Sequence, residues 1–174
     1  MELAPWSLED LPALHALWID PDVRRFLWDG EVISRERAAE VVRAGIDSFE
    51  RHGFGFWAIR EKRRKGLIGF CGFRFMEPGA EVEILYGIDP RLWGRGYATE
   101  AARGLLEWAF RETGLRQVLA GADAPNRASF RVLKKLGMRY QGTRPTPAGE
   151  ANYWIIDREA FSTGDQIPRP SASE

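Results

Sequence analysis

The chain has 174 residues, and its composition excludes several broad classes of function. Its 25 basic and 25 acidic side chains balance, so there is no broad positive field to attract nucleic acid or an anionic membrane. The single cysteine, Cys71, and two histidines are too few for an internal disulfide or a metal centre. Hydrophobic residues make up 44% of the chain, which is enough to fill one core.

The pattern along the chain predicts one domain at residues 1–161. From Ser162 the sequence is polar and rich in Pro and Ser, so residues 162–174 are predicted to form a flexible tail. The charged cluster at residues 60–65 is predicted to be a solvated hairpin turn. Residues 1–10 lack the features of a secretory signal, and no apolar run is long enough to span a membrane, so we expect a cytoplasmic protein.

Apolar periodicity predicts alternating helices and strands. The first helix is expected to begin at Ser7, with Asp10 at the third position, and to bury Leu8, Leu11 and Leu14. The other predicted elements are a strand at residues 2–6, helices at 20–26 and 34–53, strands at 54–60, 67–75 and 81–88, a helix ending at 113, a strand at 115–122, a helix from 126 to 136, and a hairpin of 138–143 with 151–157.

A glycine-rich turn, DPRLWGRGYAT, joins the strand at 81–88 to the helix that follows. Gly94 and Gly96 lack the Cβ that would hold a phosphate away, and the start of the helix offers unpaired backbone N–H groups. Arg91 and Arg95 add charged donors. The segment therefore predicts an anion-binding loop, with an ordinary connecting turn as the alternative.

The turn lacks two common phosphate-binding motifs, which argues against nucleoside triphosphates and dinucleotides as its ligand. A Walker loop ends in Gly-Lys-Ser/Thr, whereas this turn ends in Gly-Tyr-Ala-Thr. A dinucleotide fingerprint requires Gly or Ala at the position of Thr99 and a carboxylate about 20 residues further on. The remaining pattern, R-x-x-G-x-G-x-A from Arg91 to Ala98, resembles the acyl-coenzyme A pyrophosphate loop of the GNAT N-acetyltransferases. The longer string WGRGYATEA is similar to the RimJ/RimL-like branch of that family.

A second segment carries the same resemblance. Residues 126–138 reproduce the family pattern N-x-x-S-x-x-x-L-x-K-x-G-F/M, which implies that Asn126 and Ser129 face the pantetheine arm and sulfur of the coenzyme. The residues alone also allow a simpler interpretation, in which Asn126 only caps a helix and Ser129 only lies in its first turn. Gly137 is predicted to end this helix.

The resemblance covers residues 1 to about 161 and implies a fold and a reaction. The implied fold is α/β, with αβα layers and a central, mostly antiparallel mixed sheet flanked by helices. The implied function is direct transfer of an acetyl group, in a ternary complex, from acetyl-CoA to a protein N-terminal α-amine or a small-molecule amine, without a metal. The alternative is a non-catalytic acyl-CoA sensor or interaction module. The expected partners are acetyl-CoA and the acceptor, with no nucleic acid or membrane, and the protein is expected to be a monomer or homodimer.

The resemblance also implies that the strand before the loop splays from its neighbour, so that its backbone binds the acetyl carbonyl and pantetheine amides. Gly87 suits such a splay because glycine weakens strand pairing, although it can also be an ordinary strand glycine. The residues expected to contact the coenzyme are Tyr86, Gly87, Ile88, Arg91, Trp93, Gly94, Arg95, Gly96, Tyr97, Ala98, Thr99, Asn126 and Ser129.

Glu83 is the candidate general base, because it lies four residues before Gly87 on the same side of the strand. It also matches the family motif E-I-x-Y-x-I/L-x-P, and the alternative is a solvent-facing charge, as expected for Glu81. Many GNAT enzymes carry an acid tyrosine seven residues after the capping Asn, but here that position is Leu133. Ser129 is the best substitute, which makes Glu83, Ser129 and Asn126 the predicted catalytic residues.

The acceptor is the least determined part of the prediction. A lysine side chain has a pKa of about 10.4 and an α-amine one of about 8, so a single carboxylate suits the α-amine better. The resemblance also allows polyamines, antibiotics and other small amines. Trp28, Asp29, Gly30 and Glu31 lie between two predicted helices and are candidates for the acceptor wall, with Trp28 and Glu31 as the expected contacts. A core position for Trp28 is the alternative.

Overall fold

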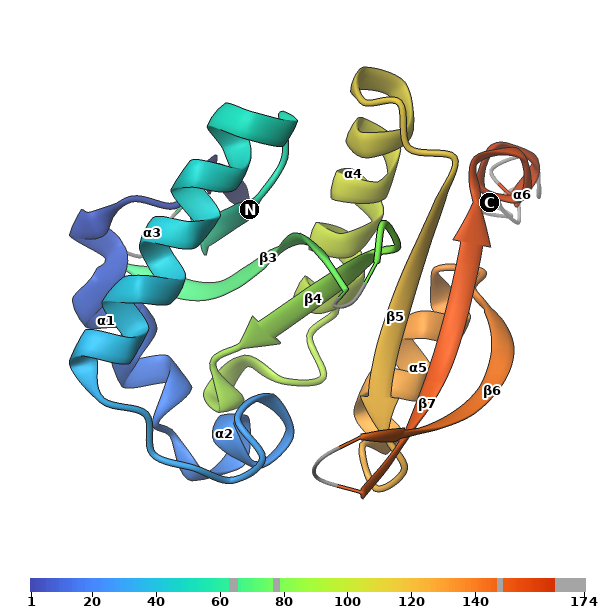
Figure 1. Ribbon diagram of the computed structural model, residues 1–174. Helices are drawn as coiled ribbons and strands as arrows, with labels where there is room; N and C mark the ends of the chain where they lie inside the picture. Colours follow the sequence, from blue (N-terminus) through green and yellow to red (C-terminus); the bar gives the residue numbers. More distant parts are fainter. Residues whose placement is uncertain (63–65, 77–78, 147–148, 165–174) are drawn as a thin grey trace, which may run out of the picture.

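Seven strands form one mixed sheet in the order β1-β2-β3-β4-β5-β7-β6 (Figure 1). The computed structural model describes residues 1–62, 66–76, 79–146 and 149–164. Neighbouring strands are antiparallel except β4 and β5, which are parallel. The strands are β1 (Glu2–Pro5), β2 (Phe56–Arg60), β3 (Leu67–Phe75), β4 (Val82–Ile88), β5 (Gln117–Asp123), β6 (Arg139–Thr146) and β7 (Gly149–Asp157).

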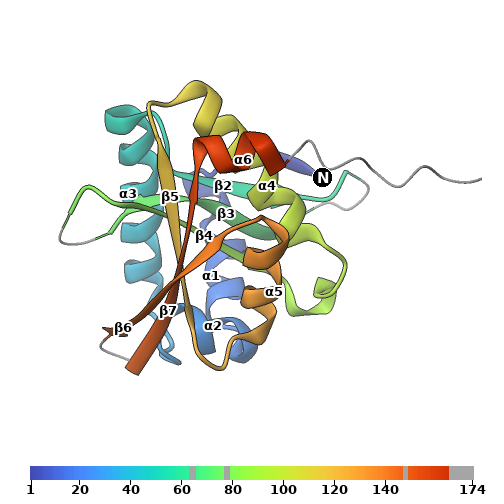
Figure 2. The ribbon, with the colours of Figure 1, turned by 90° about the vertical axis from the view of Figure 1, so that its right-hand side faces the viewer.

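Helices cover both faces of this sheet (Figure 2). One face packs against α1 (Leu11–Trp18), α2 (Pro21–Leu27) and α3 (Arg35–His52). The other packs against α4 (Tyr97–Glu112) and α5 (Arg127–Lys135), and α6 (Arg158–Gly164) follows β7. The predicted α/β class and its layered, mostly antiparallel mixed sheet are therefore confirmed. Within the part of the chain that the structure describes, none of the helices is both long and apolar enough to cross a membrane.

The helix boundaries follow the capping signals. Ser34 Oγ accepts a hydrogen bond of 3.1 Å from the Arg37 N–H at the start of α3, and Gly53 ends that helix with a φ of 75°. At the first helix the prediction was partly wrong. A 3₁₀ turn occupies Leu8–Asp10 and α1 begins at Leu11, so Leu8 lies outside the helical stripe that buries Leu14 and is 47% exposed.

Three of the predicted segments fall partly on residues outside the described ranges. The charged turn includes residues 63–65 and the last hairpin includes residues 147–148, and both of these short ranges lie outside the described residues. In the predicted tail, α6 includes residues 162–164, and residues 165–174 lie outside the described part.

Strand β4 positions the site because its two sides face different cores. Val82, Ile84 and Ile88 pack beneath α4, whereas Leu85 packs beneath α1 and α3. On one edge, β4 is paired with β3 at every position from Val82 to Ile88. On the other edge, β4 pairs with β5 at one position among the described residues, Glu83 with Leu119. The two parallel strands therefore separate after Glu83, which confirms the expected splay.

Candidate active site

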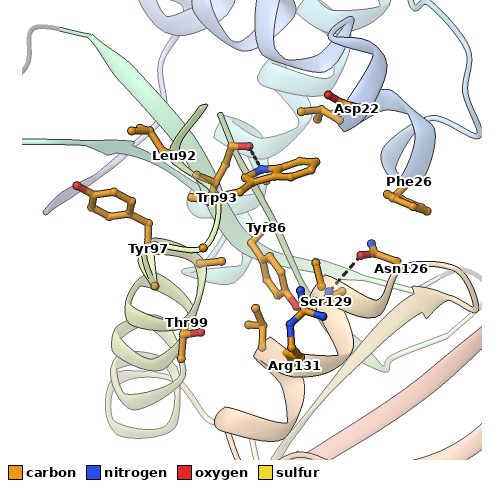
Figure 3. A pocket seen from close by; sticks show the side chains of 18 of the residues that line it. Asp22, Phe26, Tyr86, Leu92, Trp93, Tyr97, Thr99, Asn126, Ser129 and Arg131 are labelled. Carbon is orange, nitrogen blue, oxygen red and sulfur yellow. Dashed lines mark hydrogen bonds between the residues drawn. The ribbon is translucent and has the colours of Figure 1, made fainter. Parts of the chain in front are cut away.

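A cavity of about 250 Å³ lies at the edge of β4 that has separated from β5 (Figure 3). We call it the β4 cavity. It is lined by the end of β4, the glycine turn, the first turn of α4, and parts of α2 and α5. Both sequence motifs therefore meet in one place. The expected coenzyme contacts that line it are Tyr86, Gly87, Ile88, Trp93, Gly94, Gly96, Tyr97, Ala98, Thr99, Asn126 and Ser129.

The glycine turn needs its glycines for their backbone conformation. Gly94 and Gly96 have φ values of +77° and +87°, in the left-handed region that L side chains rarely adopt. A Cβ at either position would meet no heavy atom within 4 Å, so the space beside them is open. Gly96 is the N-cap of α4. The first turn of this helix, whose N–H groups have no carbonyl partner within the helix, therefore lies at the cavity wall, an arrangement that suits an anion.

The basic residues at the cavity differ from the expected ones. Arg91 and Arg95 are exposed and do not line the β4 cavity, and the Arg91 Nη2 lies 2.5 Å from Asp89 Oδ2. Arg131 and Lys135 of α5 line it instead. Sequence reasoning missed them, although residues 128, 131, 132 and 135 have the spacing of one helix face. It also missed the wall from α2, made by Asp22, Val23, Phe26 and Leu27.

Asn126 and Ser129 are placed by the start of α5. Asn126 Oδ1 accepts a 3.1 Å hydrogen bond from the Ser129 N–H, so Asn126 caps the helix and also lines the cavity. Ser129 Oγ lies 2.7 Å from the Tyr86 hydroxyl oxygen, and the two side chains point toward one another (Figure 3). Burial raises the pKa of Tyr86 above its usual value, which keeps the phenol neutral and able to donate.

The Tyr86 side chain is a site feature that sequence reasoning did not assign, because only its backbone was expected to bind. Strand alternation was the available signal, since Tyr86 shares a side with Ile84 and Ile88 rather than with Glu83. Leu133, where many relatives carry a tyrosine, is fully buried in the core beneath α5. In this chain a tyrosine hydroxyl reaches Ser129 from β4 rather than from α5.

Glu83 lies on the opposite side of β4 from Tyr86 and does not line the β4 cavity. It is 7% exposed, and its Oε1 accepts a 2.7 Å hydrogen bond from Arg74 Nε on β3. A solvent-facing charge is therefore excluded for Glu83. Glu81 is exposed as expected and pairs with Arg144 at 3.4 Å. Glu83 is also the last β4 residue in register with β5, which puts it at the start of the gap between the strands.

Gly87 and Trp93 shape the edge of β4. A Cβ on Gly87 would lie 2.5 Å from Phe70 Cε1, so glycine is required there by the packing of the Phe70 ring. The Trp93 indole N–H donates to the Ile88 carbonyl at 2.7 Å, which fixes the Trp93 ring beside the end of β4 (Figure 3).

The expected acceptor contacts lie apart from the β4 cavity. Trp28 is half-buried, and its ring meets that of Trp18 edge to face with centroids 5.7 Å apart. It lines a second cavity on the other face of the sheet. Glu31 is exposed and lines neither cavity.

A family model described as "Acetyltransferase (GNAT) domain" matches residues 1–139. The chain belongs to the GNAT acetyltransferase family. YkkB of Bacillus subtilis, whose function is uncharacterized, is 34% identical over 129 residues, which are 73% of this chain and 74% of YkkB. The family match shows an acyltransferase enzyme with the GNAT fold.

Two solved structures have the same fold as this GNAT chain. The aminoglycoside acetyltransferase AAC(6')-Ib, in complex with coenzyme A and kanamycin, has a TM-score of 0.78 at 18% identity, covering 94% of this chain and 98% of the other. RimL, a ribosomal L7/L12 α-N-protein acetyltransferase in complex with coenzyme A, has a TM-score of 0.77 at 21% identity, covering 91% and 94%. At these identities the likeness establishes the fold alone.

Proposed function

We propose that this GNAT enzyme transfers an acetyl group from acetyl-CoA directly to a primary amine, in a ternary complex, and that it belongs to the RimJ/RimL-like branch. The observation that carries the proposal is the joining of two motifs in the β4 cavity, at the edge where β4 leaves β5. A cytoplasmic location and a monomeric or homodimeric state complete the proposal.

The residues of the β4 cavity fit acetyl-CoA. The open space beside Gly94 and Gly96, next to the N-terminus of α4, suits a pyrophosphate. Arg131 and Lys135 are cations available for a further phosphate. The free edge of β4 offers the backbone groups of Tyr86 and the Ile88 N–H to the pantetheine amides, as an added strand would use them, whereas the Ile88 carbonyl is bonded to Trp93.

Acetyl-CoA would supply an electrophilic thioester carbonyl for attack by the amine. Glu83 accepts the proton that the amine nitrogen loses as the amide bond forms and the C–S bond breaks. Its position at the start of the gap allows the amine to approach from the α3 face while the β4 cavity holds the coenzyme. Arg74 orients the Glu83 carboxylate through Oε1.

Ser129 and Tyr86 act on the sulfur side of the reaction. A phenol is a better donor than an alcohol, so the Tyr86 hydroxyl donates to Ser129 Oγ and leaves the Ser129 proton directed at the sulfur. A free thiol has a pKa of about 8.5, so the coenzyme can leave as a thiolate near neutral pH. A hydrogen bond from Ser129 is therefore enough to stabilise the departing sulfur, and no proton needs to leave Ser129. Tyr86 is in this account a positioning residue for Ser129.

This pairing gives a prediction for Ser129→Ala and Tyr86→Phe. Each variant loses one hydrogen bond, worth about 1 to 2 kcal/mol, so turnover should fall by roughly 5- to 30-fold with little change in the KM for acetyl-CoA. Because Tyr86 acts through Ser129, the double variant should turn over no more slowly than Ser129→Ala alone. Losses that multiply in the double variant would contradict this relationship. Tyr140→Phe, on exposed β6, is the matched control.

The acceptor is proposed to be a protein N-terminal α-amine or a small-molecule amine. An α-amine, with a pKa of about 8, is closer to neutral at physiological pH than a lysine side chain. The reported structural neighbours include one enzyme bound to kanamycin and one that acts on a ribosomal protein, so both kinds of acceptor occur on this fold. A screen of acetyl-CoA consumption with N-terminal peptides, polyamines and aminoglycosides tests the proposal. Coenzyme binding without turnover on any amine would favour a sensor.

A further inference from the structure

Helix α2 supplies an apolar wall of the β4 cavity. Val23, Phe26 and Leu27 line the cavity, and their spacing places them on one face of the helix. Phe26 and Leu27 are half-buried, so each side chain also reaches open space. Phe26 lies toward Asn126, at the end of the cavity away from Tyr97 (Figure 3). In the proposed function this wall faces the sulfur end of the coenzyme rather than its pyrophosphate.

The Leu27 side chain lies where two cavities adjoin. Among the described residues it is the one that lines both the β4 cavity and the second cavity, on the other face of the sheet. In the proposed reaction the sulfur lies beside Ser129 in the β4 cavity, and the amine arrives beside Glu83 from the opposite face. The thioester carbon lies between them, because it is bonded to the sulfur and attacked by the amine. It therefore lies at the junction that Leu27 borders.

Packing behind Leu27 holds its side chain in place. The side chain packs against the core cluster that contains the fully buried residues Trp18 and Val42. The start of α2 is fixed by Asp20, whose Oδ1 accepts a 2.9 Å hydrogen bond from the Asp22 N–H. A side chain with a close-packed core behind it cannot move aside without disturbing that core. Leu27 is therefore a fixed boundary for whatever is bonded to the thioester carbon.

The acyl chain and the attacking amine need separate space. The chain extends from the thioester carbon in the plane of the thioester, whereas the amine attacks from above that plane. For every acyl group the same amide bond forms and the same C–S bond breaks. The length of the chain is consequently limited by the side chains that border the carbon and not by the chemistry. One methylene too many in an apolar pocket changes kcat/KM by about 10- to 200-fold.

We propose that Leu27 limits the length of the transferred acyl group, so that the enzyme uses acetyl-CoA in preference to butyryl-CoA. This inference rests on the proposed function, because it locates the thioester carbon between Ser129 and Glu83. The chain of a butyryl group extends two carbons beyond the acetyl methyl, and these carbons meet the fixed side chains of Leu27 and Phe26. Leu27 is thus a specificity-determining residue for the donor and takes no part in proton transfer.

A comparison of two donors with one acetylated amine tests this role. In the unmodified enzyme, kcat/KM for butyryl-CoA should be about tenfold or more below that for acetyl-CoA. Leu27→Ala shortens the side chain to a methyl group, so the ratio of butyryl-CoA to acetyl-CoA activity should rise by about tenfold or more. Leu27→Val should give an intermediate ratio, and it keeps the test available if Leu27→Ala does not fold. An unmodified enzyme that uses both donors equally would overturn the proposal.

Leu11→Ala is the matched control for Leu27→Ala. Leu11 is also half-buried and packs against the same core cluster, but it is not among the described lining residues of either cavity. Both variants should lose thermal stability, because each removes the same carbon atoms from one cluster. Only Leu27→Ala should change the donor ratio. The same ratio in Leu27→Ala as in Leu11→Ala would overturn the assignment of Leu27.

Binding measurements separate this inference from the proposed function. Ready transfer of a butyryl group by the unmodified enzyme would overturn the inference and leave the transferase function standing. If no amine is acetylated, the proposed function fails, and calorimetry with acetyl-CoA and butyryl-CoA still tests Leu27. Weaker binding of butyryl-CoA by the unmodified protein, with the difference lost in Leu27→Ala and kept in Leu11→Ala, would support the role of Leu27. Equal binding of the two donors by the unmodified protein, or binding of neither, would overturn it.

Discussion

Glu83→Gln should lower turnover by about 10² to 10⁴ while leaving the affinity for acetyl-CoA nearly unchanged. Glutamine keeps the size of the side chain and an oxygen that accepts from Arg74 Nε, so the buried contact between β3 and β4 survives. What is lost is the basicity that removes the amine proton. Turnover at saturating acetyl-CoA, with calorimetric binding of the coenzyme, measures the two effects separately.

Glu81→Gln is the matched control for this substitution. Glu81 lies two residues earlier in the chain, is exposed, and pairs only at the surface with Arg144. It should keep full turnover. The pH dependence of the residual activity gives a further check, since removal of the base should change the acidic limb of the profile. A profile that is the same in Glu83→Gln as in the unmodified enzyme would mean that the base lies elsewhere.

Gly96→Val should weaken acetyl-CoA binding by well over tenfold. The side chain would enter the open space beside the N-terminus of α4, where a phosphate oxygen is expected to meet backbone N–H groups. It would also be strained, because φ at Gly96 is +87° and a β-branched residue rarely adopts that conformation. Some loss of thermal stability is therefore expected together with the loss of binding.

Gly53→Val separates strain from binding. Gly53 has a φ of +75°, an equally open environment and a position at the end of α3, outside both cavities. The two variants should lose similar amounts of thermal stability, and only Gly96→Val should lose coenzyme affinity. Normal acetyl-CoA binding by folded Gly96→Val would show that the phosphate cradle is misplaced.

The order of helices and strands was readable from sequence because local signals agree with the fold. Ser34 and Gly53 bound α3, Asn126 caps α5, and the apolar alternation of β4 matches its two buried faces. Leu8 was misjudged because its spacing fits a helix that in fact begins three residues later. Local pattern does not determine where a 3₁₀ turn gives way to an α-helix.

The site was predicted best where backbone conformation determines it. Gly94, Gly96 and the start of α4 form the expected turn because positive φ and a helix N-terminus are local properties. Arg91 was expected to contact the coenzyme but does not line the cavity, because its guanidinium pairs with Asp89, two residues away in the chain. The pairing of Tyr86 with Ser129 joins positions 43 residues apart in the chain. No local pattern could predict such a contact.

The order of substrate addition and product release tests the central claim, which is direct transfer in a ternary complex. Initial rates measured over a grid of acetyl-CoA and amine concentrations should give intersecting double-reciprocal lines. Cys71 is unsuited to carry an acetyl group, since it is fully buried and burial raises the pKa of its thiol above the usual range. Mass spectrometry of the protein after incubation with acetyl-CoA alone should accordingly find no acetyl adduct. Parallel lines together with an acetylated enzyme would contradict the account.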